Sequence, residues 1–311
     1  MPTKKVNTWK FHFRGSSLIV GVPYLWLLVF FLCPCLILLK ISFADSVLQI
    51  PPYSNILKWI NDSAAQLTLN FANYRLLLTD DLYVRTFTTS IVIAANSAFA
   101  CLLIGYPMAY AIVRSRPKIR MILLMLIVLP FWTSFLIRVY SWVILLAPTG
   151  LINKALMYLG IIDQPLKLMG NYCAVAVGII YTYLPFMVLP IYSSLEKIDN
   201  SVVEAAYDLG CTPIKAFFSV ILPLSMRGVA TGFSLVFMPA IGEYVMPEIL
   251  GDASTVTIGR IVWNEFFTNL SWPVASALSV MMIIFVAIPV MLWYGGQQIR
   301  LNKKLNIHEK V

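Results

Sequence analysis

Glu243 has the most informative chemistry in the sequence, because its acidic side chain lies inside a long apolar segment. A charged side chain at the centre of a membrane helix costs about 2.5–3.5 kcal/mol on insertion scales, so it persists where it meets water, a partner or a cation. The neighbouring Tyr244 offers an aromatic face, which attracts cations. Glu243 and Tyr244 are therefore candidates for the path of a positively charged solute.

The alternative for Glu243 is an ion pair with Arg138 that holds two helices together. Arg138 follows an apolar run, and we expect its long side chain to extend to the outer interface of a membrane. Trp132 and Tyr183 are further candidates for the path, although aromatic side chains in spans most often serve packing. Glu248 is a candidate at the outer mouth of the path, and a solvated loop charge is its other interpretation.

The histidines and cysteines show no pattern of catalysis or metal binding. The two histidines, His12 and His308, lie near the two ends of the chain, and the five cysteines are scattered. The chain contains no Gly-Lys-Ser/Thr phosphate loop, which excludes ATP binding in the usual way. We therefore predict no catalytic residue, no metal site and no cofactor bound by this chain, and a membrane enzyme is disfavoured.

The elements that position these side chains are predicted to be membrane helices. Of the 311 residues, 59% are hydrophobic and 12% are charged, whereas a soluble domain carries about 25% charged residues. Crossing a bilayer takes roughly 20 residues of helix, and lipid offers an open backbone no hydrogen-bond partners. Six apolar blocks are long enough: 17–39, 87–113, 119–146, 174–195, 228–250 and 274–294. We predict an all-α membrane protein with six transmembrane helices.

The distribution of basic residues predicts the orientation of these helices. An even number of spans puts both termini on one side, together with the loops 114–120 and 196–227. This side holds 15 of the 23 lysines and arginines, and the loops of the opposite side hold seven. Such an excess is typical of the cytoplasmic side, so both termini are predicted to be cytoplasmic. The net charge of +9 is explained in this way, and nucleic-acid binding is not expected.

The segment 196–227 carries a second pattern, which predicts two short helices. Ser201 and Glu204 have the spacing of a capping box, so a helix is expected to begin there. Gly210 suits the left-handed residue that ends a helix. Thr212 and Pro213 suit the cap and first position of the next helix. The segment is therefore predicted to form a helix–turn–helix elbow on the cytoplasmic side.

This elbow resembles the coupling loop of type I importer permeases of the ATP-binding-cassette (ABC) class. The resemblance rests on Glu204-Ala205-Ala206, on Gly210 and on the closing Leu222-Pro223, with Val220 where the family has isoleucine. In that family the loop forms a helix that docks in a cleft of the ATPase subunit, and Ala205 and Ala206 leave one face flat for this contact. The resemblance thus implies a coupling role for Glu204, Ala205, Ala206, Asp208, Gly210, Leu222 and Pro223.

Four further segments, 130–140, 183–190, 242–248 and 272–277, resemble the spermidine/putrescine branch of the family, and putrescine permeases are the nearest likeness. The resemblance implies a multi-pass permease of the bacterial inner membrane that works by alternating access. Its implied partners are a second homologous permease, a dimer of ATP-binding subunits that uses ATP and Mg, a periplasmic polyamine-binding protein and membrane lipid. The implied divisions are an N-terminal tail, first span and outer loop (1–86), a permease core (87–295) and a cytoplasmic tail (296–311).

Other transport functions remain as alternatives. A permease for another small solute, such as sulfate or molybdate, is expected to present basic or neutral groups along its path, so Glu243 favours a cation. A secondary cation transporter or an ion channel works without an ATPase and has no need of a protruding elbow.

Overall fold

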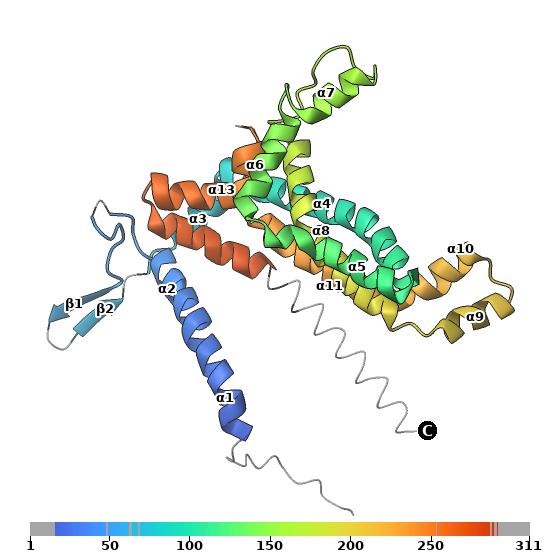
Figure 1. Cartoon of the computed structure of the whole chain (residues 1–311). Coiled ribbons are helices and arrows are strands. Elements are labelled where there is room, and N and C mark those ends of the chain that lie inside the picture. Colours follow the sequence, from blue (N-terminus) through green and yellow to red (C-terminus); the bar gives the residue numbers. More distant parts are fainter. Residues whose placement is uncertain are drawn as a thin grey trace, which may run out of the picture.

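The computed structural model describes residues 16–47, 49–61, 64–67, 69–252, 254–286, 288 and 291. Helices dominate it, as Figure 1 shows, and the predicted all-α membrane architecture is confirmed. One exception is a small hairpin in the first predicted outer loop, in which β1 (Leu57–Asn61) pairs antiparallel with β2 (Ala64–Leu67). The predicted tails 1–15 and 296–311 lie outside the described residues.

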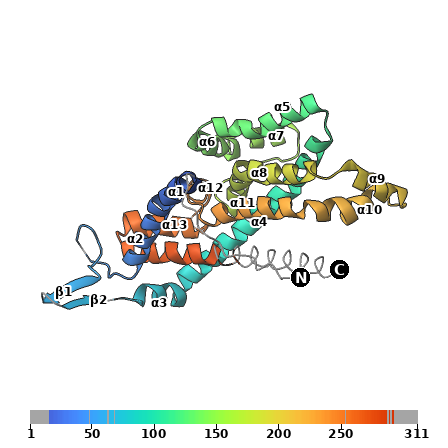
Figure 2. The same ribbon diagram turned by 90° about the horizontal axis from the view of Figure 1, so that it is seen from below.

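Three long helices form the centre of the molecule: α4 (Asp81–Arg114), α8 (Tyr172–Glu196) and α11 (Leu222–Ile241). They lie side by side in Figures 1 and 2. Small side chains on α4, such as Ala98 and Ala109, are fully buried in the same cluster as Met187 and Ile191 of α8. Such small residues let membrane helices approach each other closely.

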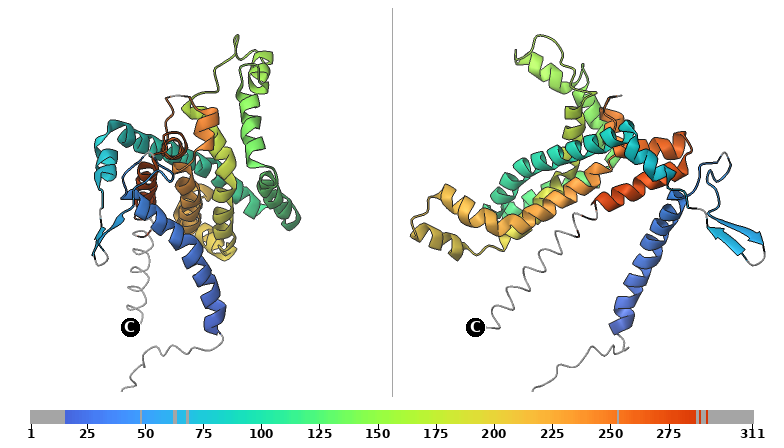
Figure 3. Two further views of the ribbon diagram at one scale, coloured as in Figure 1. Left: turned by 90° about the vertical axis from the view of Figure 1, so that its left-hand side faces the viewer. Right: turned by 180° about the vertical axis from the view of Figure 1, so that it is seen from behind.

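The first span stands apart from this bundle. The segments α1 (Ser16–Leu27), η1 (Leu28–Leu32) and α2 (Cys33–Ser42) follow one another as a single long helix, which points away from the other helices in Figures 1 and 3. Its residues 21–40 are not buried within the described chain, whereas Ile41 and Ser42 at its end are buried. Its apolar surface is therefore available to lipid or to another subunit.

The third predicted span, 119–146, is not a single helix. It consists of α5 (Pro117–Val128), η2 (Leu129–Trp132) and α6 (Phe135–Leu146), with extended backbone at Thr133 and Ser134. Pro130 has no backbone N–H to continue an α-helix. The hydroxyl and the backbone N–H of Thr133 both donate to the carbonyl oxygen of Pro130, which satisfies that group where the helix ends.

The fifth predicted span, 228–250, has the wrong bounds. Its helix already begins with α10 (Pro213–Ala216), continues through η3 (Phe217–Ile221) and α11, and ends at Ile241. A short separate helix, α12 (Val245–Leu250), follows. Pro239 weakens the last turn of α11, and Gly242 occupies the C-cap position. Glu243 therefore lies in a break between two helices and not inside one.

The remaining elements are short. They are α3 (Ala72–Thr79), α7 (Leu151–Tyr158), α9 (Asn200–Asp208), α13 (Ile258–Trp263) and η4 (Asn264–Thr268).

Within the described residues, five helical stretches are long and apolar enough to cross a membrane: Gly21–Ser42, Asp81–Arg114, Phe135–Tyr158, Tyr172–Glu196 and Pro213–Ile241. The helix Trp272–Val286 is apolar but shorter. The predicted sixth span, 274–294, extends beyond the continuous part of the chain that the structure describes, so the count of six and the side of the termini stay predictions.

Candidate substrate path and coupling helix

The carboxylate of Glu243 has two neutral hydrogen-bond donors. Its Oε2 accepts a hydrogen bond of 2.6 Å from the hydroxyl of Tyr183 on α8, and its Oε1 accepts one of 3.1 Å from the backbone N–H of Val245. The second bond caps the start of α12. Glu243 is buried, with 9% of its surface exposed. The residue thus joins the middle of α8 to the break between α11 and α12.

The helix α13 holds the backbone of this break. The hydroxyl of Thr257 donates to the carbonyl oxygen of Glu243 at 3.4 Å. Gly259 lies so close that a Cβ atom there would be 2.5 Å from the carbonyl oxygen of Gly242 and 2.8 Å from that of Glu243. A side chain at position 259 would therefore push α13 away from the break.

The position of Tyr183 gives the depth of the site. Tyr183 is eleven residues from the start of the 25-residue helix α8, which corresponds to about 16 Å along the helix axis. The Tyr183–Glu243 contact is therefore near the middle of α8. Non-helical backbone inside a membrane protein is tolerated where it is buried in protein or lines a water-filled cavity.

Glu243 has no basic partner within the described part of the chain. The ion pairs there are Arg120 with Glu196 at 3.2 Å and Arg260 with Glu248 at 2.7 Å. The alternative of an ion pair between Glu243 and Arg138 is therefore absent from this conformation. A buried charge that is not paired is costly, so the carboxylate is suited to a cation that arrives from outside the chain.

Arg138 does not extend to the surface as expected, because the break before α6 folds aromatic rings around it. It is 9% exposed, and its guanidinium carbon lies 5.5 Å from the ring centre of Phe131 and 5.8 Å from that of Phe135. Its Nε and Nη1 atoms have no hydrogen-bond partner in the described residues. Attraction between the guanidinium and the aromatic faces partly offsets the cost of this burial.

Aromatic rings connect the two breaks. The ring of Phe131 lies 5.2 Å from that of Phe186 on α8, and Phe186 lies 6.2 Å from Tyr183. Arg138 and Glu243 are therefore at opposite ends of a row of three rings. The two buried charges belong to one layer of the molecule, yet each is without a partner of opposite sign.

The other predicted path residues have different surroundings. Tyr244 stacks on Trp263 of α13, with ring centres 4.6 Å apart and an interplanar angle of 15°. The charge of Glu248 is paired with Arg260, which weakens its case as an attractor of cations. Trp132 is 81% exposed beside the break in the third segment. The structure thus brings Tyr183, Glu243 and Tyr244 together, but it does not place Trp132 in direct contact with them.

Sequence reasoning missed the partner of Tyr244. Trp263 lies in the predicted outer loop 251–273, and the residue pattern of this loop gave no sign of a helix packed on the break. The close approach of Gly259 is the feature that brings Trp263 there.

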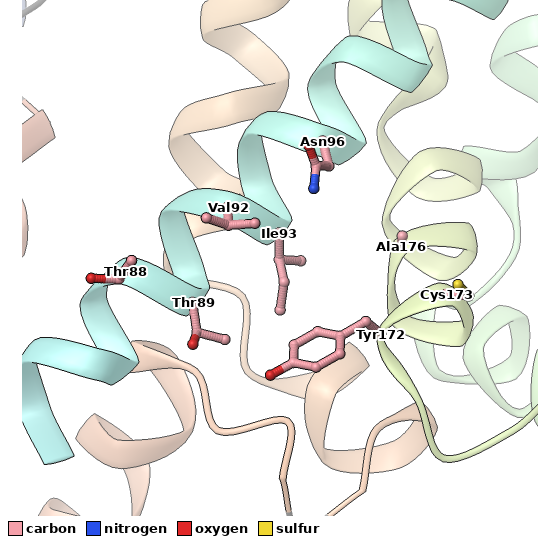
Figure 4. A pocket seen from close by; sticks show the side chains of 8 residues that line it. All are labelled: Thr88, Thr89, Val92, Ile93, Asn96, Tyr172, Cys173 and Ala176. Atoms are coloured by element: carbon pink, nitrogen blue, oxygen red, sulfur yellow. The ribbon is translucent and has the colours of Figure 1, made fainter.

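A cavity of about 430 Å³ lies between α4 and the start of α8. In Figure 4, Thr89, Ile93 and Asn96 of α4 face Tyr172 across this space. Its lining is mainly apolar, and it contains none of the acidic residues considered above. It is therefore a poor candidate for the binding of a charged solute.

The predicted elbow is confirmed, and α9 and α10 protrude at one end of the molecule (Figures 1 and 2). Gly210 ends the first helix with a positive φ of 80°, and Thr212 caps the second by accepting from the N–H of Lys215. The first cap was predicted wrongly. Asp199 and not Ser201 caps α9, because its Oδ1 accepts from the backbone N–H of Ser201 at 3.0 Å. This hydrogen bond lowers the pKa of the Asp199 carboxyl.

The predicted coupling residues do not all share one exposed face. Glu204, Ala205, Asp208 and Gly210 are exposed, and Ala206 is buried with 7% of its surface accessible. The flat face offered by α9 is therefore that of Ala205, whereas Ala206 packs inside the elbow. Leu222 and Pro223 form the start of α11 instead of a loop.

Comparison with known proteins identifies the class. The family described as "Binding-protein-dependent transport system inner membrane component" matches residues 101–301. The spermidine/putrescine transport system permease protein PotB of Haemophilus influenzae is 35% identical over 295 residues, which cover 94% of this chain and 98% of that protein.

Two crystal structures have a similar fold. The first is a bacterial ABC transporter involved in the import of the acidic polysaccharide alginate, with a TM-score of 0.67 and 15% identity over 92% of this chain and 96% of the other. The second is a bacterial alginate ABC transporter in complex with an alginate pentasaccharide-bound periplasmic protein, with a TM-score of 0.64 and 16% identity over 89% and 91% of the two chains. At this identity the likeness concerns the fold alone.

Proposed function

We propose that this chain, which belongs to the family of binding-protein-dependent transport system inner membrane components, carries a polyamine. It is an ABC importer permease of the bacterial inner membrane. ATP hydrolysis belongs to a separate subunit in this class. The observation that carries the proposal is the buried carboxylate of Glu243, which has neutral donors and no basic partner in the described residues. Alkylammonium groups have pKa values near 10.4, so polyamines are cations at neutral pH and suit such a carboxylate.

We further propose putrescine as the principal cargo, with spermidine as the close alternative. The name of the 35% identical relative supports the polyamine class without separating these two amines. The choice of putrescine rests on the resemblance of the segments 130–140, 183–190, 242–248 and 272–277 to the spermidine/putrescine branch, in which putrescine permeases are the nearest likeness.

In the proposed mechanism, a periplasmic binding protein delivers the amine, which then moves past Glu243 by alternating access. The Tyr183 hydroxyl is a neutral donor, so an ammonium group can share or replace its hydrogen bond without competing against a fixed cation. Tyr244 adds an aromatic face for the same cation. Trp132 and Glu248 remain proposed path residues of lower rank, because Trp132 is 81% exposed and the charge of Glu248 is paired with Arg260.

A second permease and two ATP-binding subunits complete the proposed importer. The second permease, homologous to this chain, supplies the other half of the path. The exposed residues of the elbow, Glu204, Ala205, Asp208 and Gly210, are proposed to dock on an ATP-binding subunit that uses ATP and Mg, while Ala206, Leu222 and Pro223 support the elbow from inside. No cofactor is proposed for this chain itself.

Arg138 favours a second candidate function, the import of a small anion. Its buried guanidinium has two nitrogen atoms without a hydrogen-bond partner in the described residues, and a carboxylate or an oxyanion would satisfy both of them. The amine proposal is preferred because the carboxylate of Glu243 lies in a helix break, whereas Arg138 is already covered by two aromatic rings.

The ATPase activity of the complete importer in proteoliposomes distinguishes these cargoes. The rate is measured with the cognate binding protein after incubation with putrescine, spermidine or sulfate. We expect both amines to stimulate hydrolysis, putrescine more strongly, and sulfate to have no effect. Stimulation by sulfate without stimulation by either amine would exclude the polyamine proposal.

A further inference from the structure

We propose that the aromatic rings of Tyr244, Trp263 and Phe267, with the carboxylates of Glu243 and Glu265 at the two ends, form an entrance subsite for a linear alkylammonium ion. The inference rests on the polyamine cargo proposed above and adds binding residues to it. These five residues are called the entrance row below. Trp263, Glu265 and Phe267 belong to the loop 251–273, which the predicted topology puts on the outer side.

The rings of the entrance row contact one another in sequence, with Tyr244 stacked on Trp263 and Phe267 tilted against it. Tyr244 lies 4.6 Å from Trp263, and Trp263 lies 4.2 Å from Phe267, measured between ring centres. Trp263 and Phe267 are 43% and 56% exposed. They are four residues apart on one helical surface, so they face the same side. A chain of methylene groups can lie along such rings while its ammonium ends remain hydrated.

A carboxylate adjoins each end of the row in the sequence, Glu243 beside Tyr244 and Glu265 two residues before Phe267, and neither has a basic partner in the described residues. Glu243 accepts from Tyr183 and the backbone, and Oε1 of Glu265 accepts from the hydroxyl of Tyr83 at 3.3 Å. Neither takes part in an ion pair there. We infer that aromatic rings with a carboxylate adjoining each end suit a molecule with an ammonium group at each end.

The only basic side chain on α13, Arg260, does not neutralise these ends. Its Nε pairs with Glu248 at 2.7 Å, and its Nη1 donates to the carbonyl oxygen of Asp252 at 3.1 Å. Asp252 is fixed in turn by hydrogen bonds from Thr255 and Ser254, which lower the pKa of its carboxyl to about 2. Arg260 thus joins α13, and with it the entrance row, to Glu248 and to the backbone of Asp252.

The competing explanation is an aromatic belt, because tryptophan and tyrosine also gather at membrane–water interfaces. Trp26 is the matched control for this explanation. It is 60% exposed on the first span and contacts Phe30 with ring centres 4.9 Å apart. A lipid-anchoring tryptophan should behave like Trp26, whereas a solute-binding one should not.

The test measures initial rates of ATP-dependent putrescine uptake by the complete importer in proteoliposomes with saturating loaded binding protein. Trp263→Leu and Glu265→Gln are each expected to reduce the rate at least fivefold, Trp263→Phe to keep more than half of it, and Trp26→Leu to leave it unchanged. Assembly of the complex, followed by co-purification of all subunits, should be normal in every variant.

The outcomes separate this inference from the proposed function. If the wild-type importer transports putrescine and both Trp263→Leu and Glu265→Gln transport it equally well, the entrance row is excluded and the polyamine function stands. If Trp263→Leu and Trp26→Leu lose uptake and assembly together, the row is an aromatic belt. If no amine stimulates ATP hydrolysis by the wild-type importer and no amine is transported, the proposed function itself is excluded.

Discussion

The environment of Glu243 shows what a residue type can and cannot predict. A carboxylate in an apolar segment indicated a functional position, and in the structure Glu243 is buried. Its partner could not be predicted, because Tyr183 is sixty residues away in the sequence and only the packing of α8 against the break brings the two together. Arg138, the other charge in an apolar segment, was the more obvious partner, and it is turned towards Phe131 and Phe135 instead.

Replacement of Glu243 by glutamine should lower uptake without loss of assembly. Glutamine keeps the size of the side chain but removes the charge, and a hydrogen bond to a charged group is worth about 1.5–3 kcal/mol. We therefore expect a reduction in uptake of about tenfold or more. Tyr183→Phe should lower the free energy of unfolding by about 1–3 kcal/mol, and it should reduce uptake less than Glu243→Gln does. Because Glu243 is not paired with Arg138, the second change Arg138→Gln should not restore uptake, and restoration would contradict the geometry.

Arg138→Met should leave the thermal stability of the subunit in detergent unchanged or higher. A buried charge without a salt bridge contributes little to stability, and its replacement by a well-packed apolar side chain is often neutral or stabilising by about 1–4 kcal/mol. The measurement is the unfolding temperature of the purified chain, with Arg120→Met, which breaks the pair with Glu196, as the comparison. A large loss of stability in Arg138→Met alone would show that the guanidinium has a partner.

At the scale of elements, the helix–turn–helix elbow could be predicted from short-range signals, whereas the breaks inside two of the long apolar segments could not. Thr212, Pro213 and Gly210 act through their immediate neighbours, so the elbow could be predicted from its sequence. The breaks at Thr133–Ser134 and Gly242–Tyr244 interrupt segments of uniform hydropathy, and hydropathy does not reveal them. The prolines Pro130 and Pro239 were the available signals, but proline is tolerated inside membrane helices, as Pro185 and Pro190 are within α8.

Gly210→Val should reduce the coupling of ATP hydrolysis to uptake. A Cβ atom at Gly210 meets nothing within 4 Å, but its φ of 80° is unfavourable for valine, with a cost of about 1–2 kcal/mol. Gly160 is a matched control, since it also has a positive φ, of 68°, and open space around it, but lies next to α7. Gly160→Val should keep normal coupling, and Gly210→Asn should be tolerated. Equal coupling ratios in Gly210→Val and Gly160→Val would argue against a role of the elbow.

The cap of α9 gives a second test at this scale. Asp199→Ala should weaken the first turn of α9 and lower coupled uptake, because it removes the acceptor of the Ser201 N–H. Ser201→Ala should have little effect, since the Ser201 side chain is not the cap. Hydrogen exchange of the α9 backbone in the purified complex measures this directly. Faster exchange in Ser201→Ala than in Asp199→Ala would support the capping box that the sequence suggested.

At the scale of the whole molecule, the chain has surfaces that its own fold does not cover. The first span is packed against the rest of the described chain only at its end, where Ile41 and Ser42 are buried, and the elbow protrudes with exposed residues at one end. Composition and positive charge predicted a membrane protein with cytoplasmic loops, but they could not predict which helices pack together. The arrangement fits a subunit that works only in a larger assembly, as the family to which it belongs implies.

The most direct test of the account is ATP-dependent uptake of labelled putrescine into proteoliposomes that hold this chain, a second permease and the ATP-binding subunits, with amine-loaded binding protein outside. We predict concentrative uptake by the complete set, none when this chain is omitted, none by this chain alone, and a reduction of about tenfold or more with Glu243→Gln. Uptake that persists without this chain, or a wild-type complex that hydrolyses ATP but accumulates no amine, would contradict the account.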